Sequence, residues 1–174
     1  QYLTENADHV IIQTPYVICN GYMYDVLQGI SNHAKLQIVL NAVEKGSNPW
    51  GCTDYLNQKK KILETGADVY ELMNDYPVHT KAVLINDRLS VVGSYNLDMR
   101  STYLDTELML VIDSEKLSQQ IHETESDYME KSKEVLANGQ ETEGAKYQGK
   151  VLNRKKKLYY GVLRIIIRPL RQLL

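Results

Sequence analysis

Apolar residues recur with two different periods over residues 1–137. Short apolar runs such as residues 9–14 predict buried strands, whereas Met23, Val26, Leu27 and Ile30 recur at the spacing of one helix face. The predicted strands are 9–14, 36–40, 67–72, 80–85, 89–95 and 106–112, and the predicted helices are 22–33, 53–65 and 114–137. Strands that alternate with helices are typical of a parallel sheet with helices on both faces. We therefore expect an α/β fold with a mixed, mostly parallel β-sheet and helices on both faces.

Turn-forming and capping residues punctuate this pattern. Residues 43–52 are rich in Gly, Ser, Asn and Pro and predict a loop. Thr53 is the expected N-cap of the helix that follows, and Gly66 its expected end. Ser114 is the expected N-cap of the long last helix of this region.

The remainder of the chain has a different composition. Residues 138–157 are rich in Gly, Gln, Glu and Lys and predict a polar, basic linker. Residues 158–174 predict a basic amphipathic helix, kinked or broken near Pro169. The expected organisation is thus a catalytic domain over 1–137, a linker over 138–157 and a C-terminal helix over 158–174.

Two interpretations of that last helix remain open. Arg164, Arg168 and Arg171 fall on one helical face, and residues 155–157 are all Lys. A basic amphipathic helix can lie in the plane of an anionic membrane. A terminal helix can equally pack on its own domain. The absence of any acidic residue in 146–174 slightly favours the membrane.

The uneven distribution of charge along the chain indicates a polyanionic partner. Of the 174 residues, 24% are charged and 43% hydrophobic, which is typical of a globular domain. Residues 1–145 carry 11 Lys and Arg against all 22 Asp and Glu, whereas residues 146–174 carry nine Lys and Arg. A basic tail on an acidic body indicates a polyanionic partner, which is an anionic membrane, nucleic acid or the acidic body itself. The acidic body argues against nucleic acid.

Cellular location is predicted from what the chain contains. Cys19 and Cys52 are the two cysteines, and neither lies in a metal-binding or disulfide pattern, so a reducing compartment is expected. The sequence contains no run of 18 apolar residues, the length that a helix needs to cross a bilayer. The chain begins with Gln1 and shows no charged segment followed by an apolar one, so we expect no signal peptide and either a piece of a longer protein or a processed product. The expected location is cytoplasmic, peripheral at the membrane.

Four polar residues are predicted to converge on one hairpin. If residues 87–88 form a two-residue turn, His79 lies opposite Asn96, and Lys81 lies opposite Ser94. Residues two apart in a strand share a face, so all four side chains would share one patch. A pairing shifted by one residue, as a three-residue loop would cause, would separate them.

Such a patch suits phosphoryl chemistry without a metal. A fixed ammonium and neutral donors can hold an anionic tetrahedral group while a bond changes. His79 is the member able to act as a nucleophile or proton carrier near pH 7, and Lys81 beside it should favour the neutral imidazole. No cluster of acids and histidines has metal-ligand spacing, so neither a metal nor a cofactor is expected.

The run HTKAVLINDRLSVVGSYNLDMRS (79–101) resembles the HKD motif of the phospholipase D superfamily, HxKx4Dx6GSxN. The continuation through Asp98, Arg100, Ser101 and Glu107 resembles its cardiolipin synthase branch. Weaker similarity reaches upstream, and the resemblance covers roughly residues 5–137. It implies a phospholipase D-like half with one HKD motif, in a family that uses two such motifs and no metal.

The resemblance also implies roles for individual residues. His79 matches a catalytic histidine, and we expect it to be the acid/base member of the pair, with a phosphohistidine formed on the other. Lys81 and Asn96 match the phosphate-binding pair, and Ser94 matches the small polar residue of the motif. Glu107 matches the acid that orients the histidine.

The sequence departs from the family pattern in two ways. Asn86 occupies the position of the motif's Asp, with Asp87 one residue later, and both are expected to have a supporting role. The chain also has a single HxK, which implies that it holds half of an active site. The expected partner is a second HKD half-domain in the same protein or a second copy in a homodimer.

The expected function is the second catalytic half of a phosphatidyltransferase of the cardiolipin synthase type, acting on a phospholipid similar to phosphatidylglycerol. One alternative is a one-motif phosphodiesterase or nuclease active as a homodimer. Another is a non-catalytic module that binds phosphate or lipid headgroups. Activity on DNA would indicate the former, and vesicle binding without turnover the latter.

Overall fold

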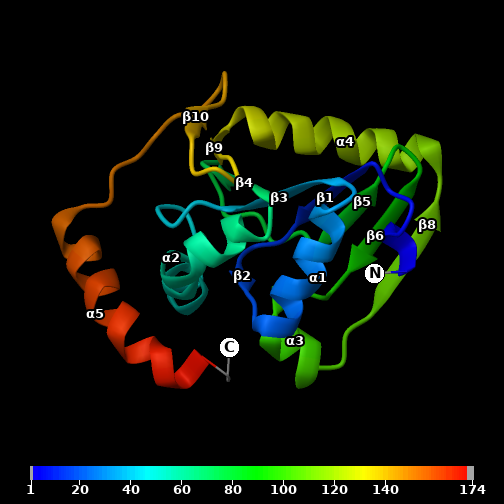
Figure 1. The fold of residues 1–174 in the computed structure, drawn as a ribbon. Helices are drawn as coiled ribbons and strands as arrows, with labels where there is room; N and C mark the ends of the chain where they lie inside the picture. The colour runs from blue at the N-terminus through cyan, green and yellow to red at the C-terminus, as the bar shows by residue number, and fades with distance from the viewer. Residues whose placement is uncertain (1, 172–174) are drawn as a thin grey trace.

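The structure is a computed structural model that describes residues 2–171 (Figure 1). The helices are the 3-10 helix η1 (Tyr2–Thr4) and the α-helices α1 (Gly21–Ser31), α2 (Pro49–Glu64), α3 (Met99–Tyr103), α4 (Glu115–Glu130) and α5 (Arg154–Leu170). The strands are β1 (His9–Gln13), β2 (Val17–Ile18), β3 (Lys35–Asn41), β4 (Asp68–Leu72), β5 (Ala82–Ile85), β6 (Leu89–Gly93), β7 (Leu97–Asp98), β8 (Met109–Asp113), β9 (Ser132–Val135) and β10 (Glu141–Glu143).

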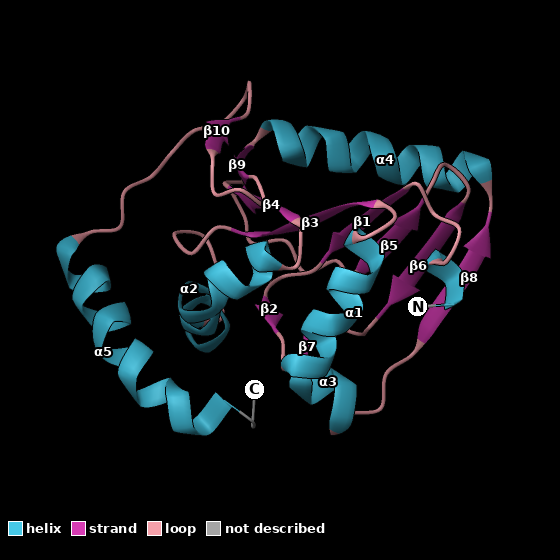
Figure 2. Ribbon diagram, viewed as in Figure 1, coloured by secondary structure: helices cyan, strands magenta, loops and turns pink. Residues whose placement is uncertain are grey.

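Within the described residues, one large sheet has eight strands in the order β10-β9-β4-β3-β1-β5-β6-β8 (Figure 2). The three adjacent strands β4, β3 and β1 are parallel. The strands on both sides of this group pair antiparallel. β2 and β7 form a separate parallel pair next to the large sheet. The predicted mixed α/β class is confirmed, with parallel pairing confined to this central group and the small pair.

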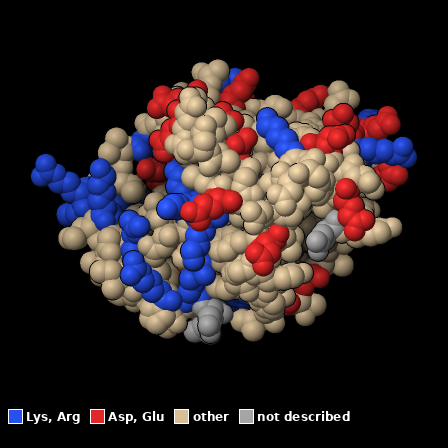
Figure 3. Space-filling view, viewed as in Figure 1, with Lys and Arg blue, Asp and Glu red and all other residues tan. Residues whose placement is uncertain are grey.

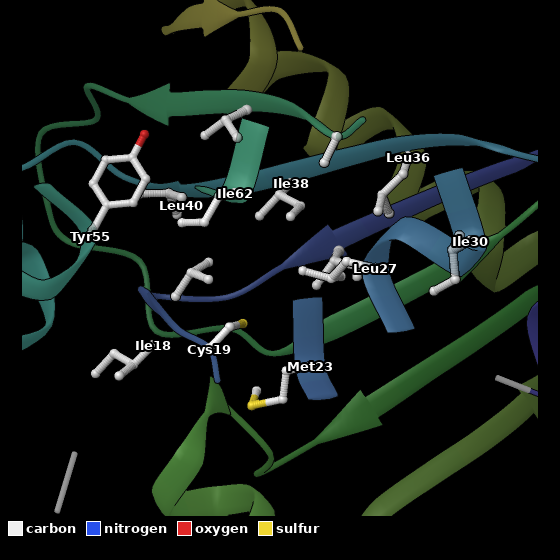
Figure 4. Packing of buried hydrophobic residues seen from close by; sticks show 14 of the residues in the cluster. Ile18, Cys19, Met23, Leu27, Ile30, Leu36, Ile38, Leu40, Tyr55 and Ile62 are labelled. Atoms are coloured by element: carbon white, nitrogen blue, oxygen red, sulfur yellow. The ribbon is translucent and has the colours of Figure 1, made fainter. Parts of the chain in front are cut away.

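Helices cover both faces of the sheet because its strands are apolar on both sides. Val10 and Ile12 pack in the core cluster that contains α1 and α2 residues, whereas Ile11 between them packs in the cluster beneath α4. Successive strand residues point to opposite faces, so one short apolar run supplies both cores. Figure 4 shows the larger cluster, where Leu27 of α1 and Ile62 of α2 lie over the strands. Complete burial of each such aliphatic side chain is worth about 1.5–3 kcal/mol.

Helix α2 begins earlier than predicted. Asn48, not Thr53, is its N-cap, and the Asn48 side chain accepts hydrogen bonds from the backbone N–H of Trp50 (3.1 Å) and Gly51 (3.2 Å). Pro49 occupies the first turn, where a missing N–H costs nothing. The predicted start was wrong because this Asn-Pro pair was assigned to a loop. The predicted end of α2 at Gly66 is confirmed, since Gly66 follows the C-cap Thr65 with φ +87°, and the predicted N-cap Ser114 of α4 is also confirmed.

Helix α4 ends at Glu130, not at residue 137 as predicted. The chain then turns into β9, which pairs with β4, and into β10, which lies within the predicted linker. Lys133 of β9 is 3.1 Å from the carboxylate of Glu71, which also accepts hydrogen bonds from Tyr55 and Lys59 at 2.8 Å. These partners lower the pKa of Glu71 against the opposing effect of its burial. The edge of the sheet is thereby tied to α2.

Helix α5 packs on α2, begins at Arg154 within the predicted linker, and ends at Leu170, directly after Pro169. Its N-cap is Asn153. Residues 172–174 of the predicted helix lie outside the described residues. Two arginines of the predicted basic face contact the domain. Arg164 donates to the Asn57 side chain (2.8 Å), and Arg171 donates to Asp54 (2.6 Å), whose side chain is completely buried. Packing of the helix on its own domain is therefore observed.

Both thiols are free, as predicted from their spacing, and both are buried. Burial is the largest cause that raises the pKa of Cys19 to about 12 and that of Cys52 to about 11. Both groups are therefore protonated near neutral pH. None of the helices within residues 2–171 combines the length and apolar character needed to cross a membrane.

Candidate functional site

The candidate site lies where β5 begins and β6 ends, beside the last residue of β3. That residue, Asn41, holds the chain just before His79. Its side-chain amide donates to the carbonyl of Val78, and its carbonyl oxygen accepts the Val78 N–H, both at 2.8 Å. Both backbone groups of Val78 are thus engaged, which fixes the backbone leading into His79. The His79 side chain itself is exposed.

Lys81 folds back against His79. Its ammonium lies 3.0 Å from Nδ1 and 3.1 Å from Nε2 of the imidazole, and it donates to the His79 carbonyl at 2.7 Å. Burial and then the positive charge of Lys81 lower the pKa of His79 below its ordinary value. This direction agrees with the prediction that Lys81 favours the neutral imidazole. A neutral imidazole can accept a proton from an alcohol near pH 7.

A second group of polar side chains surrounds Glu107. Ser94 and Ser101 each donate their hydroxyl proton to this carboxylate, the latter at 2.7 Å. The Ser101 hydroxyl also accepts the backbone N–H of Asn96 at 3.2 Å and lies 3.4 Å from its side-chain amide. The two serine hydrogen bonds lower the pKa of Glu107, which keeps it ionised near neutral pH.

Lys81 links the two groups electrostatically. It is 8% exposed, and burial lowers its pKa, while the carboxylates of Glu107 and Asp98 act in the opposite direction. The side-chain oxygen of Asn96 is buried without a hydrogen-bond partner among the described residues. The Lys81 ammonium therefore contacts the imidazole of His79 and interacts with the carboxylate of Glu107, which Ser101 links to Asn96. This set can hold an anionic tetrahedral group and move a proton to or from it.

The predicted hairpin register is wrong by one residue. Ile85 pairs with Leu89, so the loop has three residues, and Gly93 rather than Ser94 donates to the Lys81 carbonyl. The predicted opposition of His79 with Asn96 and of Lys81 with Ser94 is therefore absent. The site is built instead by the chain after β6, which turns away to pair as β7 with β2.

The predicted supporting residues lie at the other end of β5. Asn86 has φ +50°, a conformation that Asn adopts more readily than most residues. Its side-chain oxygen accepts the backbone N–H groups of Asp8 (3.0 Å) and His9 (3.1 Å) at the start of β1. Asp87 is exposed and lies 3.8 Å from Nε2 of His122. Asn86 thus fastens the hairpin loop to β1, and an amide oxygen can do so without a carboxylate.

The position of Asn41 in the site and the contacts of Ser101 were not predicted from the sequence. Asn41 ends a parallel strand, and polar residues at the carboxyl ends of such strands commonly build sites, so its position was an available signal. Ser101 was noticed only as part of the family motif, and its role as a bridge between Asn96 and Glu107 depends on helix α3. Asp98 caps this helix by accepting the Ser101 N–H at 2.6 Å.

The hydrogen bonds of the site do not include a contact between Glu107 and His79 among the described residues, and they do not direct Ser94 toward a phosphate. The Ser94 hydroxyl proton is directed at Glu107 rather than at the open patch. The orienting role of Glu107 and the phosphate-binding role of Ser94 stay predictions. The described residues contain no group of three or more His, Cys, Asp or Glu side chains placed to hold a metal ion.

Comparisons with known proteins converge on one family. The sequence profile described as "Cardiolipin synthase, PLD-like domain" matches residues 1–127. Cardiolipin synthase A of Proteus mirabilis (strain HI4320) is 30% identical over 150 residues, which are 83% of this chain and 29% of that protein. Cardiolipin synthase A of Serratia proteamaculans (strain 568) is 28% identical over 152 residues, 84% of this chain and 29% of that protein. The chain thus spans less than a third of the length of these relatives.

Solved structures share the fold at low sequence identity. Phosphatidylserine synthase of Haemophilus influenzae Rd KW20 superposes with a TM-score of 0.69 and 16% identity, over 99% of this chain and 43% of that one. Nuc from Salmonella typhimurium, a phospholipase D family member, superposes with a TM-score of 0.62 and 14% identity, over 82% of this chain and 86% of that one.

Proposed function

Because the chain belongs to the family of cardiolipin synthase domains of the phospholipase D type, we propose that it supplies one half of a phosphatidyltransferase active site. The observation that carries this proposal is the contact of His79 with the buried Lys81, whose charge interacts with Glu107, which Ser101 in turn links to Asn96. The substrate we propose is a phospholipid similar to phosphatidylglycerol. The second HKD motif would come from the rest of a longer protein or from a second copy.

In this proposal His79 carries the proton and the histidine of the second motif attacks phosphorus. The attack forms an N–P bond and breaks the bond between phosphorus and the donor alcohol, whose oxygen takes a proton from His79. The neutral His79 then accepts the proton of the acceptor hydroxyl as that oxygen attacks the phosphohistidine. The N–P bond breaks, and His79 is again protonated.

Electrostatics fit both halves of this cycle. Without substrate, burial and Lys81 keep the pKa of His79 low, which suits proton acceptance. A bound phosphodiester adds a negative charge, which favours the protonated form needed to release the donor alcohol. Lys81 and the Asn96 amide would hold the phosphate oxygens, so the charge that develops on them meets fixed partners.

The test is phosphatidyl transfer by the longer protein that contains this segment. With phosphatidylglycerol as donor and acceptor, the products are cardiolipin and glycerol. Replacement His79→Ala is expected to lower the rate by about 10²–10⁴-fold, the contribution typical of a positioned acid/base group. His33→Ala is the matched control, because His33 is exposed and its ring contacts the Thr4 carbonyl rather than the site. A His79→Ala protein with full transferase activity would overturn the assignment.

A further inference from the structure

Helix α5 has two apolar faces. Tyr160, Leu163 and Ile167 form the inner one and are buried against the domain. The rest of the helix surface exposes large apolar residues, which we call the outer apolar face. Its members, with their exposed fractions, are Leu158 (72%), Tyr159 (51%), Val162 (51%), Ile165 (70%), Ile166 (48%) and Leu170 (41%).

An exposed apolar strip of this kind needs an explanation. Single exposed apolar residues are ordinary, but a contiguous patch on a globular domain usually marks a binding surface. Here the apolar residues follow one another along most of a 17-residue helix. Because the inner face already docks on α2, the outer apolar face is not needed to attach the helix.

Cations border the outer apolar face. Arg154 and residues 155–157 lie at its first turn, and Arg168 lies near its end; all are exposed, and none forms an ion pair within the described residues. Arg164 and Arg171 differ, since they are used to dock the helix. No acidic residue occurs in 146–174 to neutralise the exposed set. Figure 3 shows the concentration of Lys and Arg on the side of the molecule where α5 lies.

We propose that the outer apolar face of α5 docks on the surface of an anionic phospholipid bilayer. The apolar side chains would enter the boundary between headgroups and acyl chains, and the bordering cations would meet the lipid phosphates. A second copy of the chain is a less suitable partner for this face, because pairing two such faces would also bring their unpaired cations together. The inference deepens the proposed lipid chemistry and rests on it for the choice of a lipid partner.

The position of α5 relative to the candidate site supports this occupant. Arg168 and Arg171 at the end of α5 line a hollow of about 430 Å³ together with Met99, Tyr103 and Leu104 of the α3 region. Tyr103 and Leu104 are themselves 55% and 63% exposed. Since α3 also carries the serine that bridges Asn96 and Glu107, the C-terminal end of α5 lies next to a helix that forms part of the site.

The test is flotation of the 174-residue chain with vesicles of phosphatidylcholine alone or with 30% phosphatidylglycerol. We expect at least tenfold tighter binding to the anionic vesicles, and weaker binding in high salt. The double variant Val162→Ser, Ile165→Ser should bind at least tenfold less tightly than the parent. Leu110→Ser, Val111→Ser is the matched control, because these residues are 57% and 54% exposed on β8, and it should bind like the parent.

Independent readouts keep the outcomes distinct. Ile165→Trp should show a blue-shifted emission component with anionic vesicles, relative to the parent with its single Trp50. Vesicle binding by α5 requires no turnover, so failure of the proposed catalysis would leave this result intact. Equal vesicle binding by the parent and the α5 double variant would overturn the inference. Loss of a concentration-dependent dimer in that variant, without vesicle binding by the parent, would overturn it in favour of a second copy.

Discussion

Glu125 gives a quantitative test of the core beneath α4. Its side chain is 1% exposed, and neither carboxyl oxygen has a hydrogen-bond partner among the described residues. It lies one helical turn from Ile121 and Met129, which pack against the apolar cluster on this face of the sheet. Burial without a partner raises its pKa to about 8. The folded protein therefore holds this carboxyl group in its neutral form at pH 7.

The sign of the pH dependence follows from this shift. The folded chain binds a proton on Glu125 that the unfolded chain releases near pH 4.5. Its contribution to stability is complete below the unfolded pKa and is lost as the pH rises toward the folded value. Each pH unit in that window corresponds to about 1.4 kcal/mol. From about pH 5.5 to about pH 7.5 the group should lower the free energy of unfolding by roughly 2–3 kcal/mol.

The perturbation is Glu125→Gln, which keeps the size of the side chain and removes its titration. Urea unfolding of the parent and variant is measured at pH 5.5, 6.5 and 7.5. The free energy of unfolding of the variant, minus that of the parent, should increase across this range by roughly 2–3 kcal/mol. Glu123→Gln, at an exposed position of the same helix, should show no such increase. A constant difference between Glu125→Gln and the parent would refute the buried, neutral carboxyl group.

Two further predictions concern the HKD segment. Asn86→Asp should leave transferase activity unchanged or raised. Its free energy of unfolding in urea should be equal or about 1 kcal/mol higher, because a carboxylate accepts the N–H groups of Asp8 and His9 at least as well as an amide. A loss of more than about 1 kcal/mol in that free energy would contradict this account. Ser101→Ala removes one of the hydrogen bonds that lower the pKa of Glu107, so the acid limb of the pH–rate profile should move to higher pH. An unchanged profile would show that the bridge does not hold the carboxylate.

Much of the fold could be predicted from the sequence because its signals are local. The apolar run around Ile11 is short and apolar on both faces, which requires a strand covered on both sides. The spacing of His79, Lys81, Ser94 and Asn96 likewise predicted which segments carry the candidate site, although the predicted hairpin register was wrong. Glycine and serine at helix ends marked α2 and α4 because capping chemistry depends on neighbouring residues alone.

The errors arose where long-range contacts decide. The hairpin register depends on Asn86, whose side chain bonds to the start of β1 and stabilises a three-residue loop. β9 forms because β4 offers an edge and Glu71 a partner for Lys133, neither of which is adjacent in sequence. In α5, helical spacing placed the arginines on one face but could not show that Asp54 would turn Arg171 toward the domain.

The central claim is that His79 carries the proton in phosphatidyl transfer, and one comparison tests it directly. The longer protein and its His79→Ala variant are assayed with a phosphatidyl donor that releases an alcohol and with one that releases 4-nitrophenolate, which needs no proton to leave. The account predicts that the variant's defect in forming the phosphorylated enzyme is about 10²–10⁴-fold for the alcohol and largely disappears for nitrophenolate. An equal defect with both donors, or none with either, would contradict it.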